Sequence, residues 1–109
     1  MSAITAVFKA LSNPNRLAVF KVVGKAAKRS KKGLTIEQIC RETGMKQPAV
    51  SHHVAHLERA GLIARTKSRW WVHCRPTADG LGAVARFCKD PASFRDDGRA
   101  RRVGERGPS

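Results

Sequence analysis

Acidic side chains are scarce in this chain. Its 109 residues include 8 Asp and Glu against 22 Lys and Arg, which gives a formal net charge of +14. Only four of these acids precede residue 89, and no two of them are placed to act as a general acid and base. A glycine-rich phosphate loop and a Ser/His/Asp arrangement are also missing. We therefore expect no enzymatic activity and no catalytic residues.

Cysteines and long apolar runs are equally sparse. The cysteines number three, and this odd, low count does not suggest a secreted disulfide framework. No stretch approaches the roughly 18 apolar residues that a membrane span needs. The opening Met-Ser-Ala-Ile-Thr has no signal-peptide pattern. We expect reduced thiols, a cytoplasmic location and no membrane partner.

Positive charge is concentrated in the part of the chain that has the composition of a folded domain. Residues 1–88 carry 16 Lys and Arg against four Asp and Glu, a net charge of +12, whereas residues 89–109 have a net charge of +2. Pro, Gly, Arg and Asp dominate from Asp90 onward. We expect one domain over residues 1–89 and a flexible basic and polar tail over residues 90–109. A basic folded domain favours an anionic partner, above all nucleic acid.

The first third of the domain is predicted to be helical. Apolar residues at helical spacing indicate a helix over residues 3–11. Asn13 followed by Pro14 is typical of a helix start, so a second helix is expected from there to about residues 25–28. A basic loop over residues 28–33 follows this helix.

A helix-turn-helix is predicted next. Thr35 and Gln38 have the spacing of a capping box, and Gly44 is the expected end of that short helix. A turn over residues 45–47 leads to a fourth helix that starts near Pro48. The positions expected to be buried on the two helices are Ile36, Ile39, Cys40, Val50, Val54 and Leu57.

The hydrophobic period changes after Gly61. Residues 62–66 and 70–75 are predicted to form two strands around a Lys67-Ser68-Arg69 tip. Thr77 is expected to cap a last helix that completes the domain. The expected fold is mainly α, with about five helices and a small two-stranded β-hairpin.

The second helix of the pair has a polar outer face that suits DNA. Such a helix fits the major groove, about 12 Å wide, and offers donors and acceptors to base edges. Lys67 and Arg69 at the hairpin tip are candidates for phosphate or minor-groove contacts, which give affinity and register. A pair of solvated helices has the same pattern, but the charge of the region favours DNA. The polar face comprises Gln47, Ser51, His52, Ala55 and Arg59.

Two segments carry a recognisable motif. One is Met45-Lys46-Gln47-Pro48-Ala49-Val50-Ser51-His52-His53-Val54, followed by Leu57 and Ala60-Gly61-Leu62-Ile63. It closely resembles the recognition-helix signature of the ArsR/SmtB family of bacterial repressors. The other, Ala10-Leu11-Ser12-Asn13-Pro14-Asn15-Arg16-Leu17, resembles the segment that enters the second helix in that family. The motifs follow the family's order, and the resemblance covers roughly residues 3–88.

The resemblance implies a homodimeric winged helix-turn-helix repressor on an inverted-repeat operator of double-stranded DNA. In that family the first and last helices form the dimer interface, which corresponds to residues 3–11 and 77–88 here. His56, one turn after the expected base contacts, is a further candidate donor to bases or phosphates. The family's base contacts correspond to Gln47, Ala49, Ser51 and His52, and its wing contacts to Lys67 and Arg69.

The chain departs from the family pattern in two places. The stretch Lys25–Lys32 resembles an insertion, whose basic side chains either contact phosphates or form a solvated loop. The wing carries Trp70 and Trp71, where the family often has a charged residue or Val. We expect one of these rings to pack on the core and the other to cover part of the sheet, rather than to insert between bases.

The metal sites known in the family are not matched. Its thiolate site uses a Cys-x-Cys, and Thr35 and Glu37 occupy those positions here. Its other site starts with Asp-x-His, where this chain has Asp79-Gly80-Leu81 and no histidine in the last helix. We expect no cofactor and no metal ligand. His52 and His56 have a spacing that metal ligands can use, but they lie on the proposed DNA-contacting helix.

A thiol response is the alternative signal. Cys88 lies roughly where some persulfide-sensing relatives have one of their two cysteines, but Lys21 is near the place of the other. Cys40 could substitute as the redox partner of Cys88 only if the fold brought the two together. A small buried hydrophobe is the favoured interpretation of Cys40 and Cys74. A repressor without a small ligand also remains open.

RNA binding is the rival interpretation of the charge. It would need exposed aromatic side chains on a sheet, or a loop that clamps the backbone. Trp70 and Trp71 are the only candidates for such aromatics.

Overall fold

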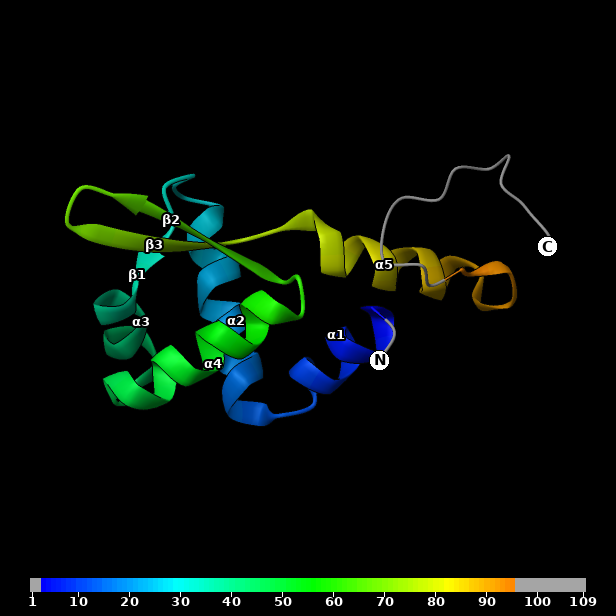
Figure 1. Cartoon of the computed structure of the whole chain (residues 1–109), viewed down its shortest axis with the longest axis horizontal. Coiled ribbons are helices and arrows are strands. Elements are labelled where there is room, and N and C mark those ends of the chain that lie inside the picture. Colours follow the sequence, from blue (N-terminus) through cyan, green and yellow to red (C-terminus); the bar gives the residue numbers. More distant parts are fainter. Residues whose placement is uncertain (1–2, 96–109) are drawn as a thin grey trace.

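The computed structural model describes residues 3–95, which form five α-helices, a three-stranded antiparallel sheet and a short 3-10 turn (Figure 1). The mainly helical fold predicted from the sequence is confirmed. The elements are α1 (Ala3–Leu11), α2 (Pro14–Ala27), β1 (Leu34–Thr35), α3 (Ile36–Thr43), α4 (Gln47–Arg59), β2 (Ile63–Ser68), β3 (Trp71–Pro76), α5 (Ala78–Lys89) and η1 (Pro91–Ser93).

Side-chain caps fix where the early helices begin. The Oδ1 atom of Asn13 accepts hydrogen bonds from the backbone N–H groups of Asn15 and Arg16, at 2.9 and 3.0 Å, and Pro14 opens α2. At α3, Thr35 and Gln38 form the expected capping box, with bonds of 3.2 and 2.9 Å. These bonds satisfy backbone donors that a helix leaves unpaired at its start.

The α3–α4 turn follows from one backbone conformation. Gly44 ends α3 with φ +76°, in the left-handed region that glycine adopts without strain. Three residues separate α3 from α4, so the two helices form a tight helix-turn-helix.

The core lies between α2, α3, α4 and the sheet. Val50, Val54 and Leu57 of α4 are fully buried, as expected from their spacing. They pack with residues of the neighbouring helices and with the first residues after α4. The other members of this cluster are Val7, Ala10, Val19, Phe20, Val23, Ile39, Leu62, Ile63 and Cys74.

The sheet has one strand more than the sequence predicted. Its order is β1-β3-β2, with Leu34 opposite Cys74 and Thr35 opposite His73. A two-residue strand has no detectable alternation, and its partner is distant in the chain, so the pattern could not reveal it. Gly33, with φ +94°, lets the chain pass close to the carbonyl of Cys74 before β1 begins.

The hairpin tip also differs from the prediction. Ser68 pairs with Trp71, so the two-residue loop is Arg69–Trp70, and Lys67 lies within β2 opposite Val72. The expectation that Lys67 lies at the tip is therefore wrong. The expectation that one of the two tryptophan rings packs on the core is also wrong, because Trp70 is 84% and Trp71 is 52% exposed. In β3, Cys74 faces the core, and strand alternation directs Trp71 to the opposite face.

A hydrogen bond that the sequence did not indicate holds the start of α5, the last α-helix of the domain. Thr77 occupies the N-cap position of α5, but its hydroxyl donates to the carbonyl of Gly61, at 2.6 Å, instead of capping the helix. After α5 and η1, the Phe94 ring packs edge-on against Phe87, with centroids 5.6 Å apart. The tail expected from residue 90 thus includes a short turn, and residues 96–109 lie outside the described part of the chain.

Candidate nucleic-acid interface

The outer face of α4 is open to solvent. Val50, Val54 and Leu57 fix the rotation of the helix because they are fully buried. At about 100° per residue, His52 and Arg59 then lie on the side opposite this stripe. The expected base-contacting residues divide by exposure: Gln47, Ala49 and His52 are exposed, and Ser51 and His56 are half-buried.

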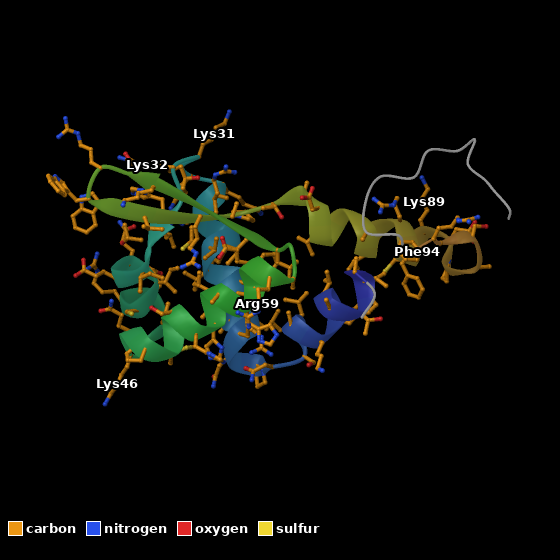
Figure 2. All side chains as sticks on the ribbon, in the orientation of Figure 1. Lys31, Lys32, Lys46, Arg59, Lys89 and Phe94 are labelled. Atoms are coloured by element: carbon orange, nitrogen blue, oxygen red, sulfur yellow. The ribbon has the colours of Figure 1, made fainter. Side chains whose placement is uncertain are left out.

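The start of α4 carries positive charge. Its N-cap residue is Lys46, which provides no side-chain cap, and the first turn contains no acid. Figure 2 shows the Lys46 side chain pointing away from the body of the protein at this end of the helix. The positive end of the helix dipole and a lysine therefore meet at one place, which suits an anion such as a DNA phosphate.

Two histidines of α4 have lowered pKa values, which favours their neutral form. Burial lowers the pKa of His53 most, and the charges of Arg16 and His52 lower it further. The pKa of His56 is also lowered, first by burial and then by the charges of Arg16 and Arg59. Arg16 is itself buried, and its Nε donates to the carbonyl of Ala10 at 2.7 Å. A neutral imidazole has one donor and one acceptor nitrogen, so His56 can offer either to a base.

His52 and His56 lie close to each other on α4. The rings of His52 and His56 are 6.5 Å apart and nearly perpendicular. Within residues 3–95, no group of three or more His, Cys, Asp or Glu side chains is placed to hold a metal ion.

An ion pair joins α4 to the hairpin. Nε and Nη2 of Arg65, on β2, both donate to Oε1 of Glu58, at 2.9 and 2.6 Å. Glu58 is the only acidic residue of α4, so this pair neutralises the one charge on the helix that would repel DNA. The hydrogen bonds that Arg65 donates to Glu58 also raise the pKa of Arg65.

The wing presents cations at its far end. Alternate residues of a strand share a face, so Lys67 lies on the same face as Arg65, the side that reaches α4. Arg69 is in the tip with φ +55°, and it is the only non-glycine residue with positive φ in the described part. Both Lys67 and Arg69 are exposed. The structure thus places both expected wing residues in the outer part of the hairpin, beyond the contact of Arg65 with Glu58 of α4.

The basic loop lies elsewhere. Lys28, Arg29, Lys31 and Lys32 are exposed, and Figure 2 shows Lys31 and Lys32 at the edge of the molecule opposite Lys46. In the same view these two lysines lie on the side of the hairpin, and Gly33 at the end of the loop packs against Cys74 of β3. The loop is therefore remote from the start of α4 but adjoins the sheet that carries the wing.

The cysteines are dispersed. Cys74 is fully buried, and burial raises the pKa of its thiol. Cys40 is half-buried on α3 and Cys88 is exposed on α5. Figure 1 shows α3 and α5 at opposite ends of the molecule, whereas the two cysteines of a disulfide lie on neighbouring segments. The fold does not bring Cys40 to Cys88 within one chain.

Sequence reasoning missed the contribution of Arg16. A lone arginine after a helix cap is usually solvated, yet this one is 8% exposed and sets the charge environment of two histidines on α4. Its position within the Ala10–Leu17 motif was the available signal.

The geometry defines the class of the protein. A capped short helix, a three-residue turn, a second helix with an open polar face and an adjoining hairpin form a winged helix-turn-helix, which places its second helix in the DNA major groove. A family model described as a helix-turn-helix domain matches residues 11–66, just over half of the chain. The chain belongs to this helix-turn-helix family of DNA-binding transcriptional regulators.

Known proteins agree with this assignment. An uncharacterized HTH-type transcriptional regulator of Methanocaldococcus jannaschii is 29% identical over 65 residues, which span 60% of this chain and 67% of the relative. An ArsR-like transcriptional regulator from Rhodococcus sp. RHA1 superimposes with a TM-score of 0.72 at 20% identity, over 84% of this chain and 80% of the other.

A third relative is the homodimeric winged helix-turn-helix domain of a possible ArsR-family regulator from Mycobacterium bovis. It superimposes with a TM-score of 0.61 at 22% identity, over 83% of this chain and 81% of the other. These likenesses show a shared fold, which confirms the resemblance to ArsR/SmtB regulators drawn from the sequence. None of the helices in residues 3–95 is long and apolar enough to cross a membrane.

Proposed function

We propose that this protein is a dimeric repressor that binds an inverted-repeat operator in double-stranded DNA. The observation that carries the proposal is the open polar face of α4, with its one acid neutralised by Arg65 and a cationic wing beside it. Base contacts fall on Gln47, Ala49, Ser51 and His52, and His56 serves as a further donor or acceptor. Lys67 and Arg69 contact the backbone beside the major groove.

Apolar side chains left in solvent support a dimer. Phe8 of α1 and Leu81 of α5 are 45% and 42% exposed. The ring centroids of Phe8 and Phe87 lie 6.0 Å apart, so α1 and α5 pack together and their exposed apolar side chains form a surface, called below the α1–α5 surface, at the end of the molecule away from α3 (Figure 1). A second copy is the natural cover for this surface, and the Mycobacterium bovis relative is a homodimer.

Dimerisation through α1 and α5 determines the form of the operator. A two-fold axis relates the two copies of α4, so they present the same residues to two half-sites in opposite directions. Half-sites about 34–36 Å apart, one helical turn, allow both helices to enter the major groove on one side of the duplex. A dimer bound to such a site over a promoter is sufficient for repression. The protein would act in the cytoplasm, where the chromosome lies.

The proposal is tested by selection from a random-sequence duplex library with the purified full chain. We expect an enriched palindromic sequence, called below the selected duplex, bound at least about 10³-fold more tightly than a scrambled duplex of the same composition. A reporter promoter that contains the selected duplex should be silenced when the protein is expressed. Equal binding to the selected duplex, the scrambled duplex and a structured RNA would contradict the proposal.

A further inference from the structure

The wing ends in an unusual turn. Ser68 and Trp71 pair directly, so Arg69 and Trp70 alone form the loop between β2 and β3. Two-residue hairpin loops favour small residues such as Asn-Gly, because the backbone there needs positive φ. Here two of the largest side chains occupy it, and Arg69 adopts φ +55°. Strain of this kind is typical of functional positions rather than of turns selected for stability.

The exposure of Trp70 is the second unusual feature. At 84% it is the most exposed large hydrophobic residue in the described part of the chain, well above Phe8 and Leu81 on the α1–α5 surface. Within residues 3–95, its indole takes part in none of the aromatic ring contacts or cation–π contacts. A tryptophan left in water at a loop tip suggests a partner that covers it on binding.

The charge around the tip identifies the chemistry of that partner. Lys67 and Arg69 shortly precede Trp70 in the hairpin, and Glu58, the only acid of α4, is already paired with Arg65. A second wing would carry the same cations and be repelled. A partner with both negative charge and flat apolar faces is required, and DNA offers phosphates beside stacked bases and deoxyribose rings.

We propose that Trp70 is a wedge that enters the minor groove of DNA beside the segment contacted by α4. Its indole packs on deoxyribose and base edges and partly unstacks one base step, while Lys67 and Arg69 bind the adjoining phosphates. The inference rests on the proposed function and adds a residue to it. Because pyrimidine–purine steps unstack most readily, the wedge makes binding depend on flanking sequence that no side chain contacts through hydrogen bonds.

The chain contains its own reporter for this contact. Trp70 and Trp71 are its only tryptophans, so the Trp71→Phe protein emits from Trp70 alone and the Trp70→Phe protein from Trp71 alone. Titrating the selected duplex into full-length Trp71→Phe should quench the emission of Trp70 and reduce its quenching by acrylamide. The Trp70→Phe protein should change much less, since Trp71 lies on the sheet face away from Arg65 and α4.

Affinity provides a second measurement. With a TA step at the flank, Trp70→Ala should weaken binding about tenfold, the size expected for losing one aromatic contact to a base. With a stiff A-tract at the flank, the loss should be smaller. Trp71→Ala is the matched control and should bind like the wild type on both duplexes.

The outcomes separate this inference from the function it rests on. If anisotropy of labelled DNA shows saturation while Trp70 keeps its unbound emission and acrylamide access, the wedge is wrong and the repressor proposal stands. If the Trp70 emission instead changes with protein concentration alone, the tip contacts a second copy and the wedge is also wrong. If no duplex is enriched at all, the repressor proposal itself fails.

Discussion

Both donor nitrogens of Arg65, Nε and Nη2, converge on a single oxygen of Glu58, Oε1, at 2.9 and 2.6 Å. The hairpin is thereby attached to the last turn of α4, two elements that a DNA duplex would contact together. The two side chains are 39% and 40% exposed, so solvent screens the pair and its contribution to stability is small. It joins the wing to α4 and neutralises the carboxylate of Glu58 on the face proposed to bind DNA.

Replacing Glu58 by Gln tests this division of roles. The free energy of unfolding should fall by at most about 1 kcal/mol, since the pair is exposed. Affinity for the scrambled duplex should rise because a negative charge is lost, whereas the ratio between selected and scrambled duplexes should fall because the wing loses its anchor. Asp90→Asn, at an exposed position just after α5 and outside the proposed dimer helices, makes the same charge change and should leave that ratio intact. An unchanged ratio in Glu58→Gln would contradict the anchoring role.

Substitutions in α4 and in the wing should weaken DNA binding in different ways. His52→Ala should cost about 1–3 kcal/mol on the selected duplex and much less on the scrambled one, because base contacts carry discrimination. Lys67→Ala should weaken both complexes and lower the salt slope by about one, because it removes a phosphate contact. Lys89→Ala, at the far end of the molecule in Figure 2, is the matched control. Equal losses on both duplexes for His52→Ala would require a different base-contacting helix.

The α1–α5 surface should be required for the dimer. Leu81→Glu places a charge in the apolar surface and should give a species near 11.9 kDa, the mass of one chain, in light scattering at micromolar concentration. Cooperative binding to the selected duplex should be lost with it. Ser30→Glu introduces the same charge into the exposed basic loop and should leave the dimer intact. A wild-type protein that is monomeric under these conditions would refute the assignment.

Replacing Gly33 and Gly24 by alanine should change the free energy of unfolding in opposite directions. At Gly33 a Cβ atom would lie 2.5 Å from the carbonyl oxygen of Cys74, and φ is +94°, so Gly33→Ala should cost at least about 1–3 kcal/mol of stability. At Gly24, inside α2, no atom lies within 4 Å of the added Cβ, so Gly24→Ala should add about 0.5–1 kcal/mol. Urea unfolding monitored by circular dichroism measures both. A neutral Gly33→Ala would mean that the β1–β3 approach is looser than described.

Acid should destabilise the fold through His53 and His56. Their pKa values are lowered in the folded protein, first by burial and then by Arg16, so the unfolded chain binds more protons than the folded one below the ordinary histidine pKa of about 6.5. The stabilising effect of the neutral rings is complete above that pH and is lost as the pH falls through the lowered values. The melting temperature should therefore drop between about pH 7 and pH 5, and less in the double variant His53→Gln/His56→Gln. An identical drop in both proteins would assign the effect to other groups.

Local chemistry explains which parts of the fold could be predicted. The caps at Asn13 and Thr35 and the end of α3 at Gly44 depend on residues within four positions of one another, so the sequence revealed them. The stripe of Val50, Val54 and Leu57 was equally visible because burial repeats with the helical period.

Non-local pairing explains which parts could not. Strand β1 exists only because β3 returns beside it, and the exposure of Trp70 depends on a loop that closes one residue later than expected. The burial of Arg16 depends on the carbonyl of Ala10 in another helix. The base and phosphate contacts remain predictions, since they require a partner outside the chain.

Thr35 has two roles, and together they make the arrangement of α3 and α4 independent of the length of the loop that precedes them. Thr35 is paired with β3 through its backbone and caps α3 through its side chain, so everything after it is positioned independently of the basic loop that precedes Gly33. Residues gained or lost in that loop leave the spacing of α3 and α4 unchanged. Evolution can therefore lengthen this loop freely, and an engineer can insert a tag or a fluorophore there without moving the helix proposed to contact DNA.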